Sequence, residues 1–302
     1  MIVTRLLKLL SEPKYRPVDY EKLVPKFPFV KGIPQKIVQT CKELGALPAE
    51  LKNNIETIRN LHPGWSYLLF DDSAVEEYIK TNYGQDIWSY YNRISPRYGA
   101  AKADIFRYLF LYREGGVYLD IKSSVTRSLD EHLLPDDSFL LSFWDNLPGQ
   151  KHEGTGHYSP SFKDYPRGEI PQWCIISSKG NPLLRKVIIR ILWNMDEYNP
   201  YVNGVGWTGV VYTTGPVPFS LTIYENMDDD LVRQVDFFND FGIVYSIYEE
   251  QHGSIPYHAS RIKSDYRKEA VPVIMHRNRC VEKINERYLV FLRQSMGRKK
   301  KP

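Results

Sequence analysis

The sequence of 302 residues predicts an α/β fold built around a mainly parallel central sheet. Segments with strand and helix patterns alternate from residue 33 onward, which is typical of that class. Residues 117–121 form a short run that is apolar on both sides, as in a strand buried on both faces. This run follows a glycine pair, Gly115 and Gly116, that ends an apolar helix. Because ligands of such sheets bind at the carboxyl ends of the strands, the polar residues after each strand are the first candidates for a site.

The first half of the chain supplies two strand–helix units before the apolar helix of residues 100–114. The predicted strands are residues 33–40 and 65–70, and the predicted helices are residues 49–60, 73–81 and 87–92. Asp72 is the expected N-cap of the second helix, because its carboxylate can accept from the first free amide groups. Consecutive units of this kind predict a right-handed crossover.

The second half of the chain continues the alternation less regularly. Strands are predicted at residues 138–143, 172–177 and 271–276, and helices at residues 181–195 and 281–294, with a segment rich in glycine and threonine at residues 204–216. Residues 144–170 are rich in Gly, Pro and His and show little periodicity. A loop of this length in a compact domain tends to be functional, so we expect it near the site.

Composition allows one large domain and excludes several classes of protein. We expect a lead-in at residues 1–31, a single domain at residues 32–294 and a basic tail at residues 295–302. The formal charge is only +4, partly from the tail, so a dedicated nucleic-acid surface is excluded. The three cysteines are far apart and lack paired metal-ligand spacing, which argues against a disulfide scaffold and a zinc site.

No run of apolar residues is long enough to cross a bilayer. Residues 1–10 are apolar with Arg5 and Lys8 three apart. They form either a docked terminal helix or a weak membrane-surface helix, with the basic tail as a second contact. We therefore expect a cytoplasmic protein, with peripheral membrane contact through the termini as the alternative.

Two pairs of polar residues flank the apolar helix and the strand after it. Asp104 and Arg107 are three apart on a helix and share a face, either as an ordinary ion pair or as a pair that points into a polar cleft. Once buried, both groups need partners, which favours the cleft. Asp120 and Lys122 are two apart at the end of the strand, so they point to one side. They either pair with each other at the sheet edge or hold a ligand.

These residues carry a resemblance to a known family. The segment 103–108, ADIFRY, followed by the segment 115–120, GGVYLD, resembles the central signature of glycosyltransferase family 32, whose sugar-binding region contains a DxD motif. Residues 33–40, IPQKIVQT, and residues 62–72 are similar to the family's first two strands. Residues 214–216, TGP, and residues 274–276, IMH, are similar to a later turn and to a strand near the family's end.

The resemblance implies a Rossmann-like, A-type fold that binds a nucleotide-sugar and transfers the sugar with retention of configuration. It implies that Asp104 and Arg107 hold the donor sugar and diphosphate, and that Asp120 touches the sugar or ribose and a Mn²⁺ or Mg²⁺ ion. With Lys122, which lies at the other motif position, we expect these residues to form the catalytic group. The donor-binding residues that it implies are Gln39, Thr40, Tyr67, Asp104, Arg107, Gly116, Asp120, Thr214, Gly215, Pro216 and His276. Gln39 and Thr40 would lie near the nucleoside, Thr214 to Pro216 would shape a substrate pocket, and His276 would lie near the diphosphate.

The sequence departs from the family pattern at three positions. Val38 and Cys41 stand where the family usually has histidine and tryptophan, and Lys122 replaces the second acid of the DxD motif. In the family that acid helps to bind the metal ion, which neutralises charge on the leaving diphosphate. A protonated lysine cannot ligate a metal, but an ammonium can offset phosphate charge itself. Either Lys122 replaces the metal, or Asp120 and another acid retain a weakened metal site, and the sequence slightly favours the second.

The sequence therefore predicts a retaining transferase that moves a hexose from a UDP- or GDP-sugar to a glycan or glycolipid acceptor, in surface polysaccharide synthesis. The alternative is a degenerate module that binds a nucleotide-sugar or glycan without turnover, which Lys122 favours.

Overall fold

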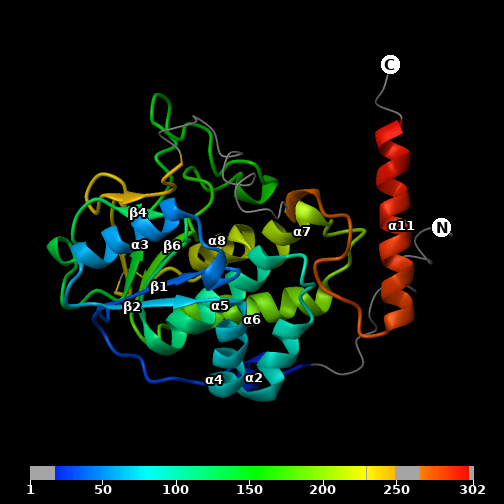
Figure 1. Ribbon diagram of the computed structural model, residues 1–302, viewed down its shortest axis with the longest axis horizontal. Coiled ribbons are helices and arrows are strands. Elements are labelled where there is room, and N and C mark those ends of the chain that lie inside the picture. Colours follow the sequence, from blue (N-terminus) through cyan, green and yellow to red (C-terminus); the bar gives the residue numbers. More distant parts are fainter. Residues whose placement is uncertain (1–17, 229, 249–265, 299–302) are drawn as a thin grey trace.

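The computed structural model describes residues 18–228, 230–248 and 266–298, and its centre is a sheet of six strands (Figure 1). The sheet has the order β2 (Ser66–Phe70), β1 (Lys36–Thr40), β3 (Gly116–Leu119), β6 (Cys174–Ser177), β5 (Phe139–Leu141), β7 (Val232–Gln234). Strand β6 is antiparallel to both of its neighbours, and all the other neighbouring pairs are parallel. The predicted α/β class with a mainly parallel sheet is thus confirmed.

Helices and a small ribbon complete the fold. The helices are α2 (Tyr20–Leu23), α3 (Ala49–Leu61), α4 (Asp72–Asn92), α5 (Gly99–Glu114), α6 (Pro182–Glu197), α7 (Gly206–Thr213), α8 (Pro216–Glu225) and α11 (Arg279–Arg298). Short 3₁₀ turns are η1 (Leu44–Ala46), η2 (Leu129–Glu131), η3 (Pro160–Phe162) and η4 (Tyr266–Lys268). The ribbon joins β4 (Ser124–Val125) and β8 (Ile243–Val244) in antiparallel pairing.

Successive residues of the central strands face two different cores, which explains why their sequences are apolar without alternation. Val38 and Tyr118 face a core formed with α4, α5 and α6, whereas Ile37 and Val117 face a core formed with α3, β4 and β8. Figure 1 shows the same arrangement, with α4, α5 and α6 on one side of the sheet and α3 and β4 on the other. The sheet is therefore the middle layer of a three-layer domain.

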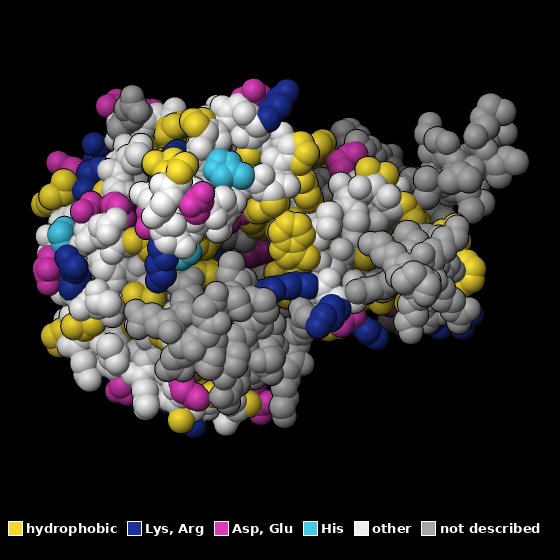
Figure 2. Space-filling view, turned by 90° about the horizontal axis from the view of Figure 1, so that it is seen from above, with side chains coloured by type: hydrophobic (Ala, Val, Ile, Leu, Met, Phe, Trp, Pro, Cys, Tyr) yellow, Lys and Arg dark blue, Asp and Glu magenta, His cyan; other side chains and the backbone are white. Residues whose placement is uncertain are grey.

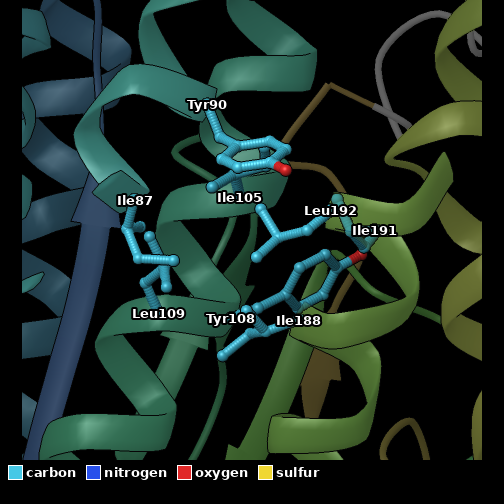
Figure 3. Close-up of a pocket in the computed structure, with 8 residues that line it drawn as sticks. All are labelled: Ile87, Tyr90, Ile105, Tyr108, Leu109, Ile188, Ile191 and Leu192. Atoms are coloured by element: carbon cyan, nitrogen blue, oxygen red, sulfur yellow. The ribbon is translucent and has the colours of Figure 1, made fainter. Parts of the chain in front are cut away.

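Helix α5 is the most buried helix of the first core. Its side chains from Asp104 to Tyr112 are all buried, and they include two charged groups, Asp104 and Arg107. Figure 3 shows side chains of α4, α5 and α6 that meet around a void, whose volume is only about 10 Å³. Such tight packing fixes the direction in which α5 presents its polar side chains.

Strand β3 begins with a glycine because β1 approaches it closely. Gly116 has φ of 108°, and a Cβ atom there would lie 2.6 Å from the carbonyl oxygen of Lys36. Only glycine accepts both the backbone angle and the contact. Gly116 therefore sets the spacing between β1 and β3, whose carboxyl ends carry the candidate site.

Several element predictions were wrong in detail. Asp71, and not Asp72, caps α4, because its Oδ1 accepts from Ala74 N at 2.9 Å. The two helices predicted within residues 73–92 are confirmed, because α4 consists of two helical segments joined at a kink at Gly84, whose φ of 73° is not helical. Residues 271–276 form a single β-bridge, Ile94 to Ile274, and no strand, since the buried segment pairs with a loop through only one residue. Residues 204–216 include α7 and the start of α8, although four glycines lower the helix propensity of this segment.

The segment before the sheet packs on the domain, and the last helix lies beside it. Val24 is buried, and the ring of Phe27 lies 5.7 Å from that of Tyr83, so residues 18–31 pack on the domain. Helix α11 lies beside the main body (Figure 1) and contacts it through the buried residues Asn285 and Leu289. Among the described residues, no helix combines the length and apolar character needed to span a membrane. The predicted domain boundaries stay predictions.

Candidate functional site

Two adjoining cavities open at the carboxyl ends of β1 and β3. The smaller, which we call the basic cavity, has a volume of about 280 Å³, and the larger, the aromatic cavity, has about 560 Å³. Figure 2 shows a hollow on this face with acidic, basic and hydrophobic side chains at its rim. The residues that line both cavities are Ala100, Arg107, Asp120, Lys122, Tyr266 and Arg267. The two cavities thus meet at a wall that carries several charges.

The charged wall consists of two acids and two bases in direct contact. Arg107 Nη2 lies 3.2 Å from Asp104 Oδ1 and 3.3 Å from Asp120 Oδ1. Lys122 Nζ lies 2.6 Å from Asp120 Oδ2. The side chains of Asp104, Arg107 and Lys122 are 3%, 5% and 8% exposed, whereas Asp120 keeps 24% of its side chain exposed. We call these four residues the charged cluster, and Asp120 is the member that most faces the open space.

The pKa values of the cluster follow from burial and from these neighbours. Burial raises the pKa of Asp104 to about 7, although Arg107 and a hydrogen bond from Thr214 favour its ionised form. Burial alone would also raise the pKa of Asp120, but Lys122 and Arg107 together lower it. Burial opposes the charge of Lys122, yet Asp120 keeps the pKa of Lys122 above its ordinary value. Asp120 and Lys122 are thus a charged pair at neutral pH, and Asp104 titrates near neutrality.

The cluster is held by a ring of hydrogen bonds from elements far apart in the sequence. Gln39 Nε2 donates to the carbonyl oxygen of Asp120 at 2.9 Å, and the Tyr67 hydroxyl donates to Gln39 Oε1. Thr214 Oγ1 donates to Asp104 Oδ2 at 2.8 Å. Gln172 Nε2 donates to Asp104 Oδ1 at 3.2 Å, and its carbonyl oxygen accepts from Arg107 Nη1 at 2.7 Å. Each member of the cluster is therefore held before any ligand arrives.

The structure places some of the residues expected to bind the donor at the two cavities, and places others behind them. Thr40 lines the basic cavity and Pro216 the aromatic cavity. Gln39 donates a hydrogen bond to the backbone carbonyl of Asp120, and Tyr67 donates to Gln39. Gly116 sets the spacing of β1 and β3, and Thr214 donates to the carboxylate of Asp104. Gly215 is the N-cap residue of α8, so the expected Thr-Gly-Pro turn is the junction of α7 and α8.

His276 lies apart from the charged cluster. It lines a third, small cavity of about 20 Å³ together with Arg93 and Asp196. Its ring Nδ1 interacts with the amide of Asn278 at 2.9 Å. The structure thus does not bring His276 to the cavities that contain the other predicted residues.

The pairing of Asp120 with Lys122 has a different cause from the expected one. Residues 120–122 form a turn after β3, with Ser123 N donating to the Asp120 carbonyl at 2.8 Å, and no longer belong to the strand. The amide of Ile247 also donates to the carbonyl oxygen of Lys122 at 2.9 Å. The turn brings the two side chains together, where strand alternation was expected to do so.

The basic cavity carries an excess of positive charge. Six cationic side chains and two carboxylates line it: Lys42, Arg97, Lys102, Arg107, Lys122 and Arg267, with Asp72 and Asp120. A low-dielectric cleft with this excess attracts a multiply charged anion. The cavity also lies at the carboxyl ends of parallel strands, which is the usual place for a nucleotide in this class of fold.

The aromatic cavity is closer to neutral and is lined by six aromatic residues: Trp144, Tyr158, Trp173, Trp207, Tyr245 and Tyr266. The rings of Tyr158 and Trp207 lie 4.9 Å apart, and these side chains are 38% and 37% exposed. Glu169 lies in the same wall and accepts from Trp144 Nε1 at 2.7 Å. Flat aromatic faces beside a polar group suit the mixed apolar and hydroxyl surface of a sugar.

Sequence reasoning missed several of the residues that build the site. The prediction that the loop of residues 144–170 lies near the site is confirmed, because Trp144, Tyr158 and Glu169 line the aromatic cavity. Gln172 directly follows this loop and gave a signal only as a polar residue at the start of a strand. Tyr245 and Arg267 gave none, since tertiary packing alone brings them to the cluster.

The cluster does not fit a protein-bound divalent ion, which the DxD resemblance implies and the sequence slightly favoured. Both carboxylate oxygens of Asp120 already contact a cation, Arg107 on one side and Lys122 on the other. In the described part of the chain, no three histidine, cysteine, aspartate or glutamate residues are grouped so that they can hold a metal ion. A divalent ion at Asp120 would lie against an ammonium group that is itself buried, so we derive no step through such an ion.

Comparison with known proteins identifies the region that holds the cluster. Residues 48–140 match the family model described as a glycosyltransferase sugar-binding region containing a DXD motif. This segment is thus similar to that family of sugar-binding regions. The resemblance found in the sequence is thereby confirmed, and it covers α3 to β5 with all four residues of the cluster.

Curated relatives are similar over a larger part of the chain. The inositol phosphoceramide mannosyltransferase 3 of Schizosaccharomyces pombe is 27% identical over 63% of this chain and 44% of its own length. The initiation-specific alpha-1,6-mannosyltransferase of Candida albicans is 26% identical over 72% of this chain and 60% of its own length. The chain thus spans about half the length of the curated relatives that it matches.

The solved structures to which the chain is similar include toxin glycosyltransferases. The PaToxG glycosyltransferase has a TM-score of 0.45 at 15% identity, covering 95% of this chain and 91% of that chain. The UDP-bound glycosyltransferase domain of the YGT toxin has a TM-score of 0.39 at 14% identity, covering 82% of this chain and 67% of that chain.

Proposed function

We propose that this protein is a retaining glycosyltransferase that moves a hexose from a UDP- or GDP-sugar to a glycan or glycolipid acceptor. The observation that carries the proposal is the charged cluster of the matched sugar-binding region, because it lies where a basic and an aromatic cavity meet. In this assignment the nucleoside diphosphate occupies the basic cavity and the acceptor enters through the aromatic cavity. The relatives named as mannosyltransferases support a sugar as the transferred group.

The charged cluster supplies groups that suit such a transfer. The bond between the anomeric carbon and the diphosphate oxygen breaks, and a bond to the acceptor oxygen forms on the same face of the sugar. The proton of the acceptor hydroxyl passes to the leaving diphosphate. Arg107 and Lys122 are cations fixed at the place where negative charge grows, which is the kind of preorganised electrostatic stabilisation that lowers the barrier most. Asp120, the most exposed member of the cluster, is placed to accept hydrogen bonds from sugar hydroxyls.

The second candidate function is binding without catalysis, which the departure of Lys122 from the family pattern favours. A module that binds the nucleotide-sugar without turnover would use the same cavities. Donor hydrolysis separates the two functions, since glycosyltransferases of this kind slowly transfer the sugar to water.

The test is to incubate the protein with a panel of UDP- and GDP-sugars and to measure the release of nucleoside diphosphate. We expect release with at least one donor, and loss of at least about 100-fold with Asp120→Asn, which removes a charge from the cluster. Binding of a nucleotide without release from any donor supports the module. Absence of both binding and release from the whole panel contradicts the proposed function.

We also propose peripheral contact with an anionic membrane through the end of the chain. Ile284, Tyr288 and Phe291 share one face of α11 and are 54%, 42% and 60% exposed. The exposed Lys283 and Arg287 flank that face, and the basic residues 299–301 follow the helix in the sequence. An apolar stripe beside basic groups is typical of helices that lie on anionic lipid.

Flotation with vesicles of phosphatidylcholine containing one-third phosphatidylserine tests this contact. We expect the protein to float with these vesicles, and Phe291→Glu to stay below, whereas pure phosphatidylcholine vesicles bind little of either protein. Equal flotation of both proteins contradicts the role of α11. The cytoplasmic location expected from the sequence stays a prediction.

A further inference from the structure

We infer that Lys122 is the resident cation of the donor site, so that the protein binds a nucleoside diphosphate without a divalent metal ion. This inference rests on the proposed function, and it concerns the one position at which the cluster departs from the DxD pattern. The second acid of that pattern is Lys122 here, and its Nζ lies 2.6 Å from the acid that remains, Asp120.

The position of Lys122 is fixed from several sides. Its ammonium lies 4.3 Å from the centre of the Tyr245 ring, whose face attracts a cation. The carbonyl oxygen of Lys122 accepts from Ile247 N, and that of Asp120 accepts from Gln39 Nε2 and Ser123 N. A flexible surface lysine would lose much side-chain freedom on binding an anion, whereas this one is already held.

The charge of the surroundings also suits a metal-free site. Six cationic side chains and two carboxylates line the basic cavity. Arg97, Lys102 and Arg107 also pair with acids outside the lining, Glu269, Glu76 and Asp104, so the cavity offers a diphosphate many cationic groups but only a small net positive charge. Arg107 contacts one oxygen of Asp120 and Lys122 contacts the other, so both oxygens already face a cation. A metal ion bound to this carboxylate would lie beside two buried cations, which would repel it.

The cluster then stabilises the leaving group through fixed ammonium and guanidinium groups. Lys122 and Arg107 line both cavities, so they lie where a diphosphate in the basic cavity would meet a sugar in the aromatic cavity. No oxidant, reductant or further reactant is needed, because the acceptor proton leaves with the diphosphate.

Binding of UDP and GDP, measured by calorimetry, tests the inference without requiring turnover. In excess EDTA we expect one of the two nucleotides to bind with a Kd within about twofold of its value in Mn²⁺ or Mg²⁺. Lys122→Met should weaken this binding by about tenfold or more, because a charge-assisted contact to phosphate is lost. Lys80→Met is the matched control, since Lys80 is exposed on α4, away from both cavities, and its loss should leave the Kd unchanged.

Lys122→Asp provides the converse test, because it restores the Asp-x-Asp pattern at residues 120–122. We expect this variant to bind the nucleotide at least about tenfold more tightly with Mn²⁺ than in EDTA, and to quench the Mn²⁺ electron paramagnetic signal when nucleotide is present. Circular dichroism spectra would establish that each variant is folded, and the wild-type comparison decides the question even if both variants fail to fold.

Each outcome has a distinct meaning. Wild-type binding that improves tenfold or more on adding metal overturns the inference but leaves the proposed function intact. Metal-independent binding with no release of nucleotide from any sugar donor supports the inference and contradicts the proposed transfer. Failure to bind either nucleotide under both conditions overturns both.

Discussion

Asp104 should make donor binding depend on pH near neutrality. Its pKa is raised to about 7 by burial, so Asp104 is neutral in acid solution and ionised in alkaline solution. The charged and titratable groups around it are Arg107 on its own helix, Asp120 across the cluster, and the tyrosines Tyr108 and Tyr266. Of these, only Asp104 has a pKa that brings its change of charge between pH 6 and 8. Loss of one proton there changes the charge of the cluster from +1 to zero.

The size of the effect follows from the geometry. Arg107 Nη2 lies 3.2 Å from Asp104 Oδ1, so a phosphate oxygen on the other side of the guanidinium would be about 7 Å from that carboxylate, and at an effective dielectric constant of about 20 the repulsion is about 2 kcal/mol. Salt and the open cavity reduce this figure, which leaves a change in Kd of about five- to thirtyfold. The sign is fixed: ionised Asp104 repels the diphosphate, so affinity should fall as pH rises through about 7.

The assay is calorimetric titration of a UDP- or GDP-sugar from pH 5.5 to 8.5. An intact nucleotide-sugar is used because its diphosphate does not change charge in this range, unlike free UDP or GDP. Asp104→Asn keeps the shape of the side chain and an oxygen that can accept from Thr214, and it should bind tightly at every pH. A wild-type Kd that stays constant across the range, or an Asp104→Asn variant with the wild-type slope, would refute the reasoning.

Three further predictions concern the frame of the site and its acceptor side. Gly116→Ala should lower the free energy of unfolding by about 3 kcal/mol or more, because its Cβ would lie 2.6 Å from a carbonyl oxygen of β1. The control is Gly84→Ala, which lies in open space with φ of 73° and should lower this free energy by only about 1 kcal/mol. Equal losses in urea unfolding would disprove the role of the close strand contact. Asp196→Ala should lower the free energy of unfolding by about 3 kcal/mol in the same assay, because Arg93 Nη1 lies 2.5 Å from its carboxylate and both side chains are mostly buried. The control is Glu56→Ala in an exposed ion pair, which should lower it by less than about 0.5 kcal/mol. A small loss for Asp196→Ala would show that the ion pair adds little. Trp207→Ala should raise the acceptor KM by about tenfold and leave the donor Kd within about twofold, because an aromatic contact to a sugar is lost in the aromatic cavity alone. A matching loss of donor affinity would place the acceptor elsewhere.

The frame of the site could be predicted from sequence because it depends on local patterns. The apolar run of α5, the glycine pair after it and the doubly buried β3 are all contiguous in the chain, and each has a strong local signal. The positions of Asp104, Arg107, Asp120 and Lys122 within this stretch follow directly. Their mutual contact was one of two alternatives from spacing, and burial with shared partners decided it.

The remainder of the site could not be predicted because it is assembled from distant segments. Gln172 contacts Asp104 and Arg107, which are 65 or more positions away in the chain. Tyr245, which directly follows β8, places its ring against the Lys122 ammonium. Nothing local distinguishes these residues from ordinary core polar groups or tyrosines. The strand expected to end in His276 failed for a related reason, since buried apolar residues at 271–274 fit a loop packed on the core as well as a strand.

A crystal structure of the protein with a bound UDP- or GDP-sugar tests the central claim most directly. The account predicts that the nucleotide lies in the basic cavity, that phosphate oxygens lie within hydrogen-bonding distance of Lys122 Nζ and the Arg107 guanidinium, and that the sugar points into the aromatic cavity. A nucleotide bound at another surface, or a diphosphate in the basic cavity that contacts neither Lys122 nor Arg107, would contradict it.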